Sequence, residues 1–116
     1  MGGHILAHVP ALSSRSMRTY TITAAELLLL HQAAGMAGDR LARQENDNGV
    51  RVMETLIAHL ETRPSQVQLN EIQCEVLGKM LMNIGYDLLQ ADEDEQAGLA
   101  ETLAERLFED EEGKTA

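Results

Sequence analysis

A shift of 47 residues lays the second half of this 116-residue chain over the first, and it constrains the fold more than any other feature of the sequence. The stretch YTITAAELLLL, from Tyr20, falls on VQLNEIQCEVL, from Val67. The same shift carries METLIAHL, from Met53, onto AETLAERL, from Ala100, without a gap. Self-similarity at a fixed spacing indicates one supersecondary unit written twice. The alternative is coincidence, because Leu and Glu are common in all helices.

Each copy of the repeat contains a helix-start signal. Thr23 followed by Glu26, and Asn70 followed by Gln73, have the spacing of a capping box, in which the two side chains bind each other's backbone N–H groups. The short alternations before the caps, YTI and VQL, are compatible with extended chain and with pairing as a small ribbon. We therefore predict that two helices begin directly after residues 23 and 70.

We predict an all-α fold, a four-helix bundle made of two consecutive αα-hairpins with an internal duplication at an offset of 47. The expected helices span residues 24–43, 50–62, 71–90 and 96–109. Pro64 separates the halves, because proline blocks helix continuation. Residues 1–19 are interpreted as a flexible lead, an upstream extension or an added segment, residues 20–110 as one helical domain, and residues 111–116 as a frayed acidic tail.

The composition limits what can fill the interior and where the protein functions. Aromatic residues make up 3% of the chain, so aliphatic side chains, Met and Ala must form the core. The single cysteine, Cys74, excludes an internal disulfide, and the front of the chain lacks a signal-peptide pattern. We therefore expect a cytoplasmic protein. No apolar run approaches the roughly 20 residues that span a bilayer, so we expect no membrane partner.

Negative charge is concentrated at the end of the chain. The net charge is −10, and residues 91–116 contain ten acidic residues against two basic ones. Such a field disfavours direct binding to nucleic acid and favours a basic protein surface. Spacings of three to four residues predict an acidic ridge on the last helix, and the alternative is a solvated, solubilising face. The ridge residues are Asp94, Glu101, Glu105, Glu109 and Glu112.

The first and third helices carry more apolar residues than one core requires. On residues 24–43 the core stripe includes Leu30, Ala33 and Ala37, and other large apolar residues lie off it. On residues 71–90 the apolar positions spread over an arc of about 200°, against the roughly 100° that one core needs. We therefore expect a homo-oligomer or an obligate protein partner, and the alternative is a compact bundle that buries everything. The expected contact residues are Leu28, Leu29, Met36 and Met80.

No catalytic, cofactor or metal site is expected. The sequence lacks the short motifs of a P-loop, a dinucleotide-binding turn and a nucleophile elbow. His4 and His8 have a spacing that can hold a metal on a helix, but no third ligand accompanies them. Cys74 falls within the apolar arc and is interpreted as an inert core thiol. His31 and His59 lie at the margins of apolar stripes, as boundary residues do.

These patterns predict a small, acidic, non-enzymatic protein-interaction module that self-associates. The alternative is an acidic inhibitor or nucleic-acid mimic that binds a basic surface of a host or defence protein, the phage or plasmid type to which anti-CRISPRs belong. The two predictions differ in their response to salt, because contacts between exposed charges weaken as ionic strength rises. No residue pattern here identifies a known family.

Overall fold

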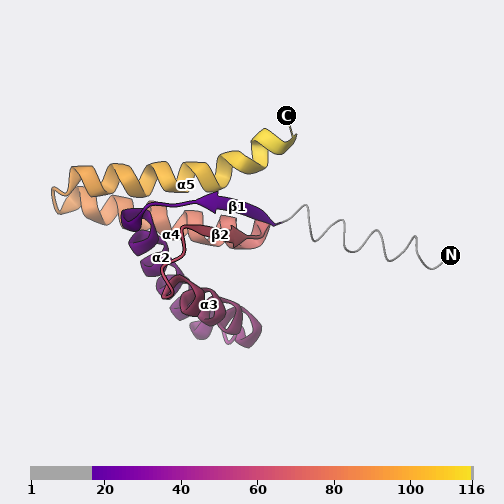
Figure 1. Ribbon diagram of the computed structural model, residues 1–116. Coiled ribbons are helices and arrows are strands. Elements are labelled where there is room, and N and C mark those ends of the chain that lie inside the picture. Colours follow the sequence, from indigo (N-terminus) through magenta and orange to yellow (C-terminus); the bar gives the residue numbers. More distant parts are fainter. Residues whose placement is uncertain (1–16, 116) are drawn as a thin grey trace.

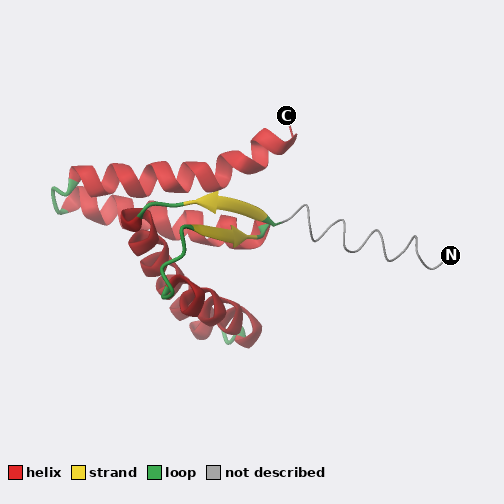
Figure 2. Ribbon diagram, viewed as in Figure 1, coloured by secondary structure: helices red, strands yellow, loops and turns green. Residues whose placement is uncertain are grey.

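The computed structural model describes residues 17–115, with side chains as far as Phe108. This part of the chain is mostly helical and carries one small sheet (Figure 1; Figure 2). The elements are β1 (Arg18–Thr21), α2 (Ala24–Arg43), α3 (Asp47–Leu60), β2 (Gln66–Leu69), α4 (Glu71–Gln90) and α5 (Asp94–Thr115). The prediction of a predominantly helical fold is confirmed, and the two strands form a ribbon of the kind with which the alternating stretches are compatible.

The helices α2 and α4 have the bounds predicted for them, because their starts are encoded locally. Both predicted capping boxes are present. The N–H of Thr23 donates to Oε1 of Glu26 at 2.8 Å, and the N–H of Asn70 donates to Oε1 of Gln73 at 2.8 Å. Each reciprocal bond from the third helical residue back to the cap side chain is also made.

The bounds of α3 and α5 differ from the prediction. Asn46 caps α3 by accepting a hydrogen bond from the N–H of Gly49 at 2.9 Å, so the helix begins at residue 47 instead of 50. Helix α5 begins at Asp94 and continues to Thr115, through most of the segment expected to be a frayed tail. Arg18 and Thr19, assigned to the flexible lead, belong to β1. Met17 is exposed, and residues 1–16 of that lead lie outside the described residues.

The turns within the two hairpins have the same backbone geometry. Glu45 and Asp92, which are 47 residues apart, follow the C-caps of α2 and α4 with φ values of 59° and 63°. The N–H of Glu45 donates to the carbonyl of Ala42 at 3.0 Å, and that of Asp92 to the carbonyl of Leu89 at 3.1 Å. A left-handed residue after the cap ends many helices and turns the chain back. Both hairpins therefore close in the same way.

The ribbon relates the two halves about a local twofold axis. Its pairs are Arg18–Leu69, Thr19–Gln68, Tyr20–Val67 and Thr21–Gln66, in antiparallel register. The shift of 47 superimposes Tyr20 on Val67, which face each other. The N–H of Ile22 donates to the carbonyl of Ser65 at 3.0 Å. The shift of 47 turns this pair into Leu69 and Arg18, which pair at the other end of the ribbon. The register of the ribbon is therefore symmetric under the shift.

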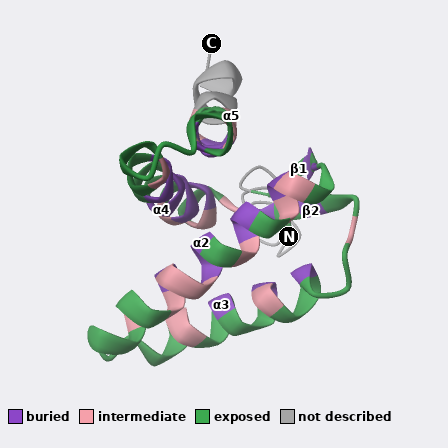
Figure 3. Ribbon diagram, turned by 90° about the vertical axis from the view of Figure 1, so that its left-hand side faces the viewer, coloured by how far each residue is buried: buried purple, intermediate pink, exposed green. Residues whose placement is uncertain are grey.

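The hairpins cross through α2 and α4 instead of lying parallel along their whole lengths. Helix α5 packs on α4, α3 packs on α2, and α2 packs on α4. In Figure 1 the α2–α3 hairpin extends away from the α4–α5 hairpin, and the ribbon lies beside their junction. Figure 3 shows that the burial is greatest where the elements meet and that α3 is exposed on its outer side.

The core is aliphatic, as the composition predicts, with one aromatic ring. Leu30, Leu77, Leu81 and Leu103 are fully buried where the helices meet. The inward face of the ribbon adds Tyr20, whose hydroxyl lies 3.3 Å from Sγ of the buried Cys74. Burial of these side chains is the main stabilising contribution, at about 25 cal/mol for each Å² of apolar surface removed from water.

Candidate interaction surfaces

The residues predicted to form the contact surface do not lie together on the surface. Leu29 and Met80 are buried in the core, and Met36 is partly buried against it. Only Leu28 is exposed, to 72%. The interpretation of Leu29 as lying off the core face was wrong because α2 packs on several elements, α3 and α4 above all, which widens its buried arc.

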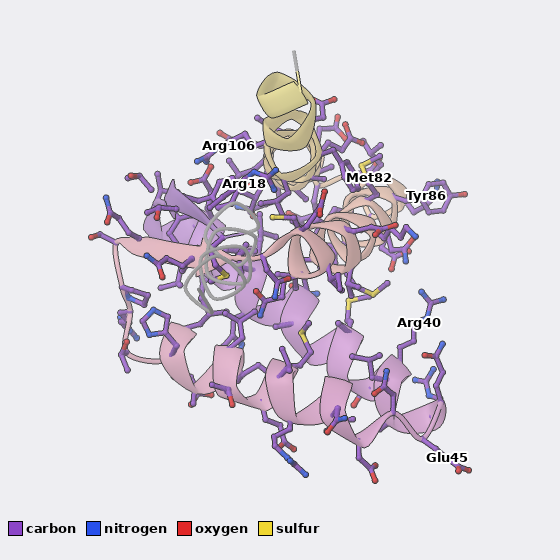
Figure 4. The ribbon with its side chains drawn as sticks, turned by 90° about the vertical axis from the view of Figure 1, so that its right-hand side faces the viewer. Arg18, Arg40, Glu45, Met82, Tyr86 and Arg106 are labelled. Carbon is purple, nitrogen blue, oxygen red and sulfur yellow. The ribbon has the colours of Figure 1, made fainter. Side chains whose placement is uncertain are left out.

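An exposed apolar surface is present instead on α4. Met82, Tyr86 and Leu89, here called the α4 stripe, follow the i, i+4, i+7 spacing that places side chains on one face of a helix. Tyr86 is 63% exposed and the other two are nearly half exposed. Figure 4 shows Tyr86 pointing away from the body of the molecule. The sequence shows the spacing of these residues. It does not show that they are exposed whereas other apolar residues of the same arc are buried in the core.

The fold itself does not require the α4 stripe. Its counterparts on α2, 47 residues earlier, are Gly35, Asp39 and Ala42, which are small or polar. Two helices with the same ends and the same kind of hairpin partner thus carry different outward faces. Of these two helices, only α4 therefore carries large apolar side chains on this outward face.

The acidic ridge is only partly described. Asp94 and Glu105 are exposed on α5, and Glu101 is half-buried against α4. The side chains of Glu109 and Glu112 lie outside the described residues. The described ridge residues therefore do not form one continuous exposed row, because Glu101 also packs beside Gly85.

A first cavity, of about 570 Å³, lies where the chain passes from α3 to β2. Its walls include Ile22, Leu27 and Leu60, and at its margin Nε2 of His31 lies within hydrogen-bond distance of Oε2 of Glu61, at 3.2 Å. In the second half the counterparts of this pair are Gly78 and Phe108. There the Phe108 ring lies directly on Gly78, so that a Cβ added to the glycine would be 2.5 Å from the ring.

A second cavity, here called the β2 groove, measures about 770 Å³ and lies between α3, β2 and the start of α4. Its counterpart in the other half is filled by Arg106. The guanidinium donates to Oε2 of Glu26 at 3.1 Å and to the carbonyl of Thr21 at 3.0 Å, and it lies 5.9 Å from the centre of the Tyr20 ring. The counterpart of Arg106 is His59, which lines the groove without filling it. The residues lining the groove are Met17, Thr19, Val52, Thr55, Leu56, His59, Gln66, Gln68, Asn70 and Gln73.

The chemistry of the described residues is limited. They contain no group of three His, Cys, Asp or Glu side chains that could hold a metal ion, and His4 and His8 lie outside them. Cys74 is completely buried, and its Sγ lies 3.3 Å from the Tyr20 hydroxyl. His31 and His59 lie at the margins of two different cavities. Across the same residues no helix combines the length and the apolar character needed to cross a bilayer.

The α4 stripe and the two cavities described above are thus candidate interaction surfaces among the described residues. Comparison of the chain with protein-family models, with curated proteins and with solved structures gave no match.

Proposed function

We propose that the chain is a small non-enzymatic protein-interaction module that self-associates through the α4 stripe. The supporting observation is that Met82, Tyr86 and Leu89 stand exposed on one helix face, where α2 carries small or polar counterparts. Tyr and Met are enriched at protein interfaces, and their burial there contributes favourably to association. A cytoplasmic location is compatible with a single, buried thiol at Cys74.

A symmetric pairing of α4 with α4 of a second copy fits the order of residues along the helix. Most homodimers are isologous, with the same patch used by both copies. Lys79 and Tyr86 lie at nearly equal distances along the helix on either side of Met82. An antiparallel pairing with its twofold axis beside Met82 therefore places each Lys79 near the Tyr86 ring of the second copy. A cation over an aromatic face adds about 0.5 to 1 kcal/mol at such exposed sites.

Cross-linking tests this arrangement directly. Met82→Cys places a thiol beside the expected axis, and Cys74 does not interfere because it is completely buried. We expect mild oxidation to convert this variant into a disulfide-linked dimer, as two Cα atoms must approach within about 7 Å for such a bond. Leu28→Cys is the matched control, because Leu28 is more exposed but lies on α2. Equal cross-linking of both variants would contradict the proposal.

Sedimentation measures the contribution of the stripe to affinity. We expect the double substitution Met82→Ser and Tyr86→Ser to weaken dimerisation by about 100-fold, as is typical when central interface residues are truncated. Asp39→Ser, the counterpart position of Tyr86 on α2, should leave the dimer unchanged. Circular dichroism checks that both variants keep their helices. A wild-type chain that sediments as a monomer at high micromolar concentration would refute self-association.

We also propose that the chain is an internal duplication of a strand–helix–helix unit. The repeated capping boxes, the repeated left-handed turns and the symmetric ribbon all support it. A test is a chain with residues 65–115 in tandem. If the unit is self-sufficient, the two copies should pair through an antiparallel ribbon, which amide-to-amide contacts in NMR spectra would reveal. A tandem chain that folds without this ribbon would count against the duplication.

The second candidate function is an acidic inhibitor or nucleic-acid mimic of the phage or plasmid type. It is favoured by the excess of ten acidic over two basic residues in positions 91–116, and by the exposure of Asp94 and Glu105 on α5. Binding through this surface should weaken steeply with salt and fail when both residues become amides. Binding to the α4 stripe should respond to neither change, so one salt titration of a captured partner separates the candidates.

A further inference from the structure

The hydrogen-bonding phase of the ribbon determines which backbone groups face outward. The N–H of Ile22 donates to the carbonyl of Ser65, which makes these two residues a hydrogen-bonded pair. Antiparallel pairs alternate between bonded and non-bonded, so the backbone groups of Thr21, Gln66 and Gln68 point away from the opposite strand. The bond from Arg106 to the carbonyl of Thr21 agrees with this phase.

The two outer edges of the ribbon are therefore equivalent by symmetry but differ in what covers them. On β1, Arg106 from α5 binds the outward carbonyl of Thr21 and is held there by Glu26. On β2 the counterpart of this carbonyl is that of Gln68, and the residue in place of Arg106 is His59. Within the described part of the chain, no hydrogen bond joins the His59 side chain to β2. Among residues 17–115, the β2 edge is thus left open where the β1 edge is closed.

The β2 groove lies beside this open edge. Gln66 and Gln68 line it from the strand, and Val52 and Leu56 line it from α3. The side chain of Gln73 replaces the carboxylate of Glu26 and brings an amide N–H₂ to the wall in place of a negative charge. The volume of the β2 groove, about 770 Å³, is within the range of ligand sites, roughly 300 to 1,000 Å³.

We propose that the β2 groove binds an extended, uncharged peptide segment of a protein partner, which adds to β2 as a third strand. The outward N–H and C=O groups of Gln66 and Gln68 are complementary to an extended main chain, and strand addition is a common mode of peptide recognition. A helix has no free main-chain groups to satisfy them. The neutral amides of the groove favour an uncharged segment, and Val52 and Leu56 favour an apolar side chain at alternate positions.

The probe is a phage-displayed library of linear heptapeptides, selected on the immobilised full-length chain. An enriched peptide, made synthetically, should slow hydrogen exchange of the Gln66 and Gln68 amides in NMR experiments. Gln68→Pro removes one outward N–H, and proline is tolerated at an edge where that group faces away from the ladder. We expect it to weaken binding by about tenfold, the value of one hydrogen bond.

Two variants make the test specific. Thr21→Pro is the counterpart substitution on the β1 edge and should leave peptide binding unchanged. The pair His59→Arg and Gln73→Glu copies the Arg106–Glu26 arrangement into the groove and should abolish binding. Tyr86→Ser should bind as wild type does, because the site is independent of the α4 stripe and of self-association.

Three results would overturn the proposal. One is a library that enriches no peptide, or only peptides that bind the Gln68→Pro chain equally well. Another is protection of both amides in the free monomeric chain, since the edge would then be covered from within the same molecule. The third is protection that rises with protein concentration in the absence of peptide, which would assign the edge to a second copy.

Discussion

The two hairpins share their helix starts, their turns and the ribbon, yet their helices meet through different side chains. In the first, α3 contributes Met53 and Ile57 to the core, and in the second the counterparts on α5, Ala100 and Ala104, are alanines. Small residues allow helix axes to approach closely. Accordingly, a Cβ added to Gly85 would lie 3.1 Å from Cγ of Glu101, whereas one added to its counterpart Gly38 would have 3.7 Å to Met53.

Corresponding positions in the two hairpins are covered by side chains in one and left open in the other. In the second half Phe108 covers Gly78, and Arg106 covers the edge of β1. In the first half the counterparts are the His31–Glu61 pair and His59, and a cavity lies at each position. At these positions the side chains of the second half are therefore the more closely packed, whereas their counterparts in the first half border cavities.

The largest expected effect compares two leucines at equivalent positions. Leu103 is fully buried between α5 and its neighbours, whereas Leu56 is buried beside the β2 groove. We expect Leu103→Ala to lower the free energy of unfolding by about 3 to 5 kcal/mol, and Leu56→Ala by about 2 kcal/mol, because water can reach the space left by the second. Urea unfolding measures both. Equal losses would show that the two halves are equally tightly packed.

Glycines provide the next comparison. Gly78→Ala forces the far end of the half-buried Phe108 ring to shift away from α4, and we expect this cost to exceed the gain in helix propensity, so that the fold is destabilised by up to about 1 kcal/mol. Gly35→Ala, in the middle of α2, meets no atom within 4 Å and should instead stabilise by about 0.5 to 1 kcal/mol. Thermal unfolding distinguishes the signs. If Gly78→Ala were also stabilising, the ring would not be held closely on the helix.

Local signals in the sequence predict the helix starts, and long-range contacts decide the rest. The capping boxes at Thr23 and Asn70 predict α2 and α4 correctly because each signal lies within four residues. The extent of α5 was missed because nothing local ends that helix at residue 109. The burial of Leu29 and Met80 follows from the crossing of α2 with α4, which periodicity along one helix does not reveal.

The candidate sites depended still more on tertiary structure. The α4 stripe has a readable spacing, but its exposure does not follow from spacing alone. The bond between Arg106 and Glu26 joins residues 80 positions apart, and no sequence pattern connects them. The groove beside His59 is visible only because the structure shows what fills the equivalent place in the other half. Comparing each residue with its counterpart 47 positions away in the structure therefore shows which features belong to one half alone.

The smallest expected effect concerns two side-chain contacts of glutamates, the Arg106–Glu26 ion pair and the His31–Glu61 hydrogen bond. Glu26→Gln copies its counterpart Gln73, keeps the capping box and removes only the charge opposite Arg106. Because the Glu26 side chain is largely buried but Arg106 is one-third exposed, we expect a loss of about 0.5 to 1 kcal/mol, and less at high salt.

Glu61→Gln is the matched change in the exposed pair with His31, and there solvent screens both partners. We expect it to change the free energy of unfolding by less than about 0.3 kcal/mol. Urea unfolding at low and high salt measures both substitutions. If Glu61→Gln cost as much as Glu26→Gln, the His31–Glu61 pair would hold α2 and α3 together as firmly as Arg106 joins α5 to β1. The His31–Glu61 contact would then stabilise the first half at the position where the contact of Phe108 with Gly78 stabilises the second.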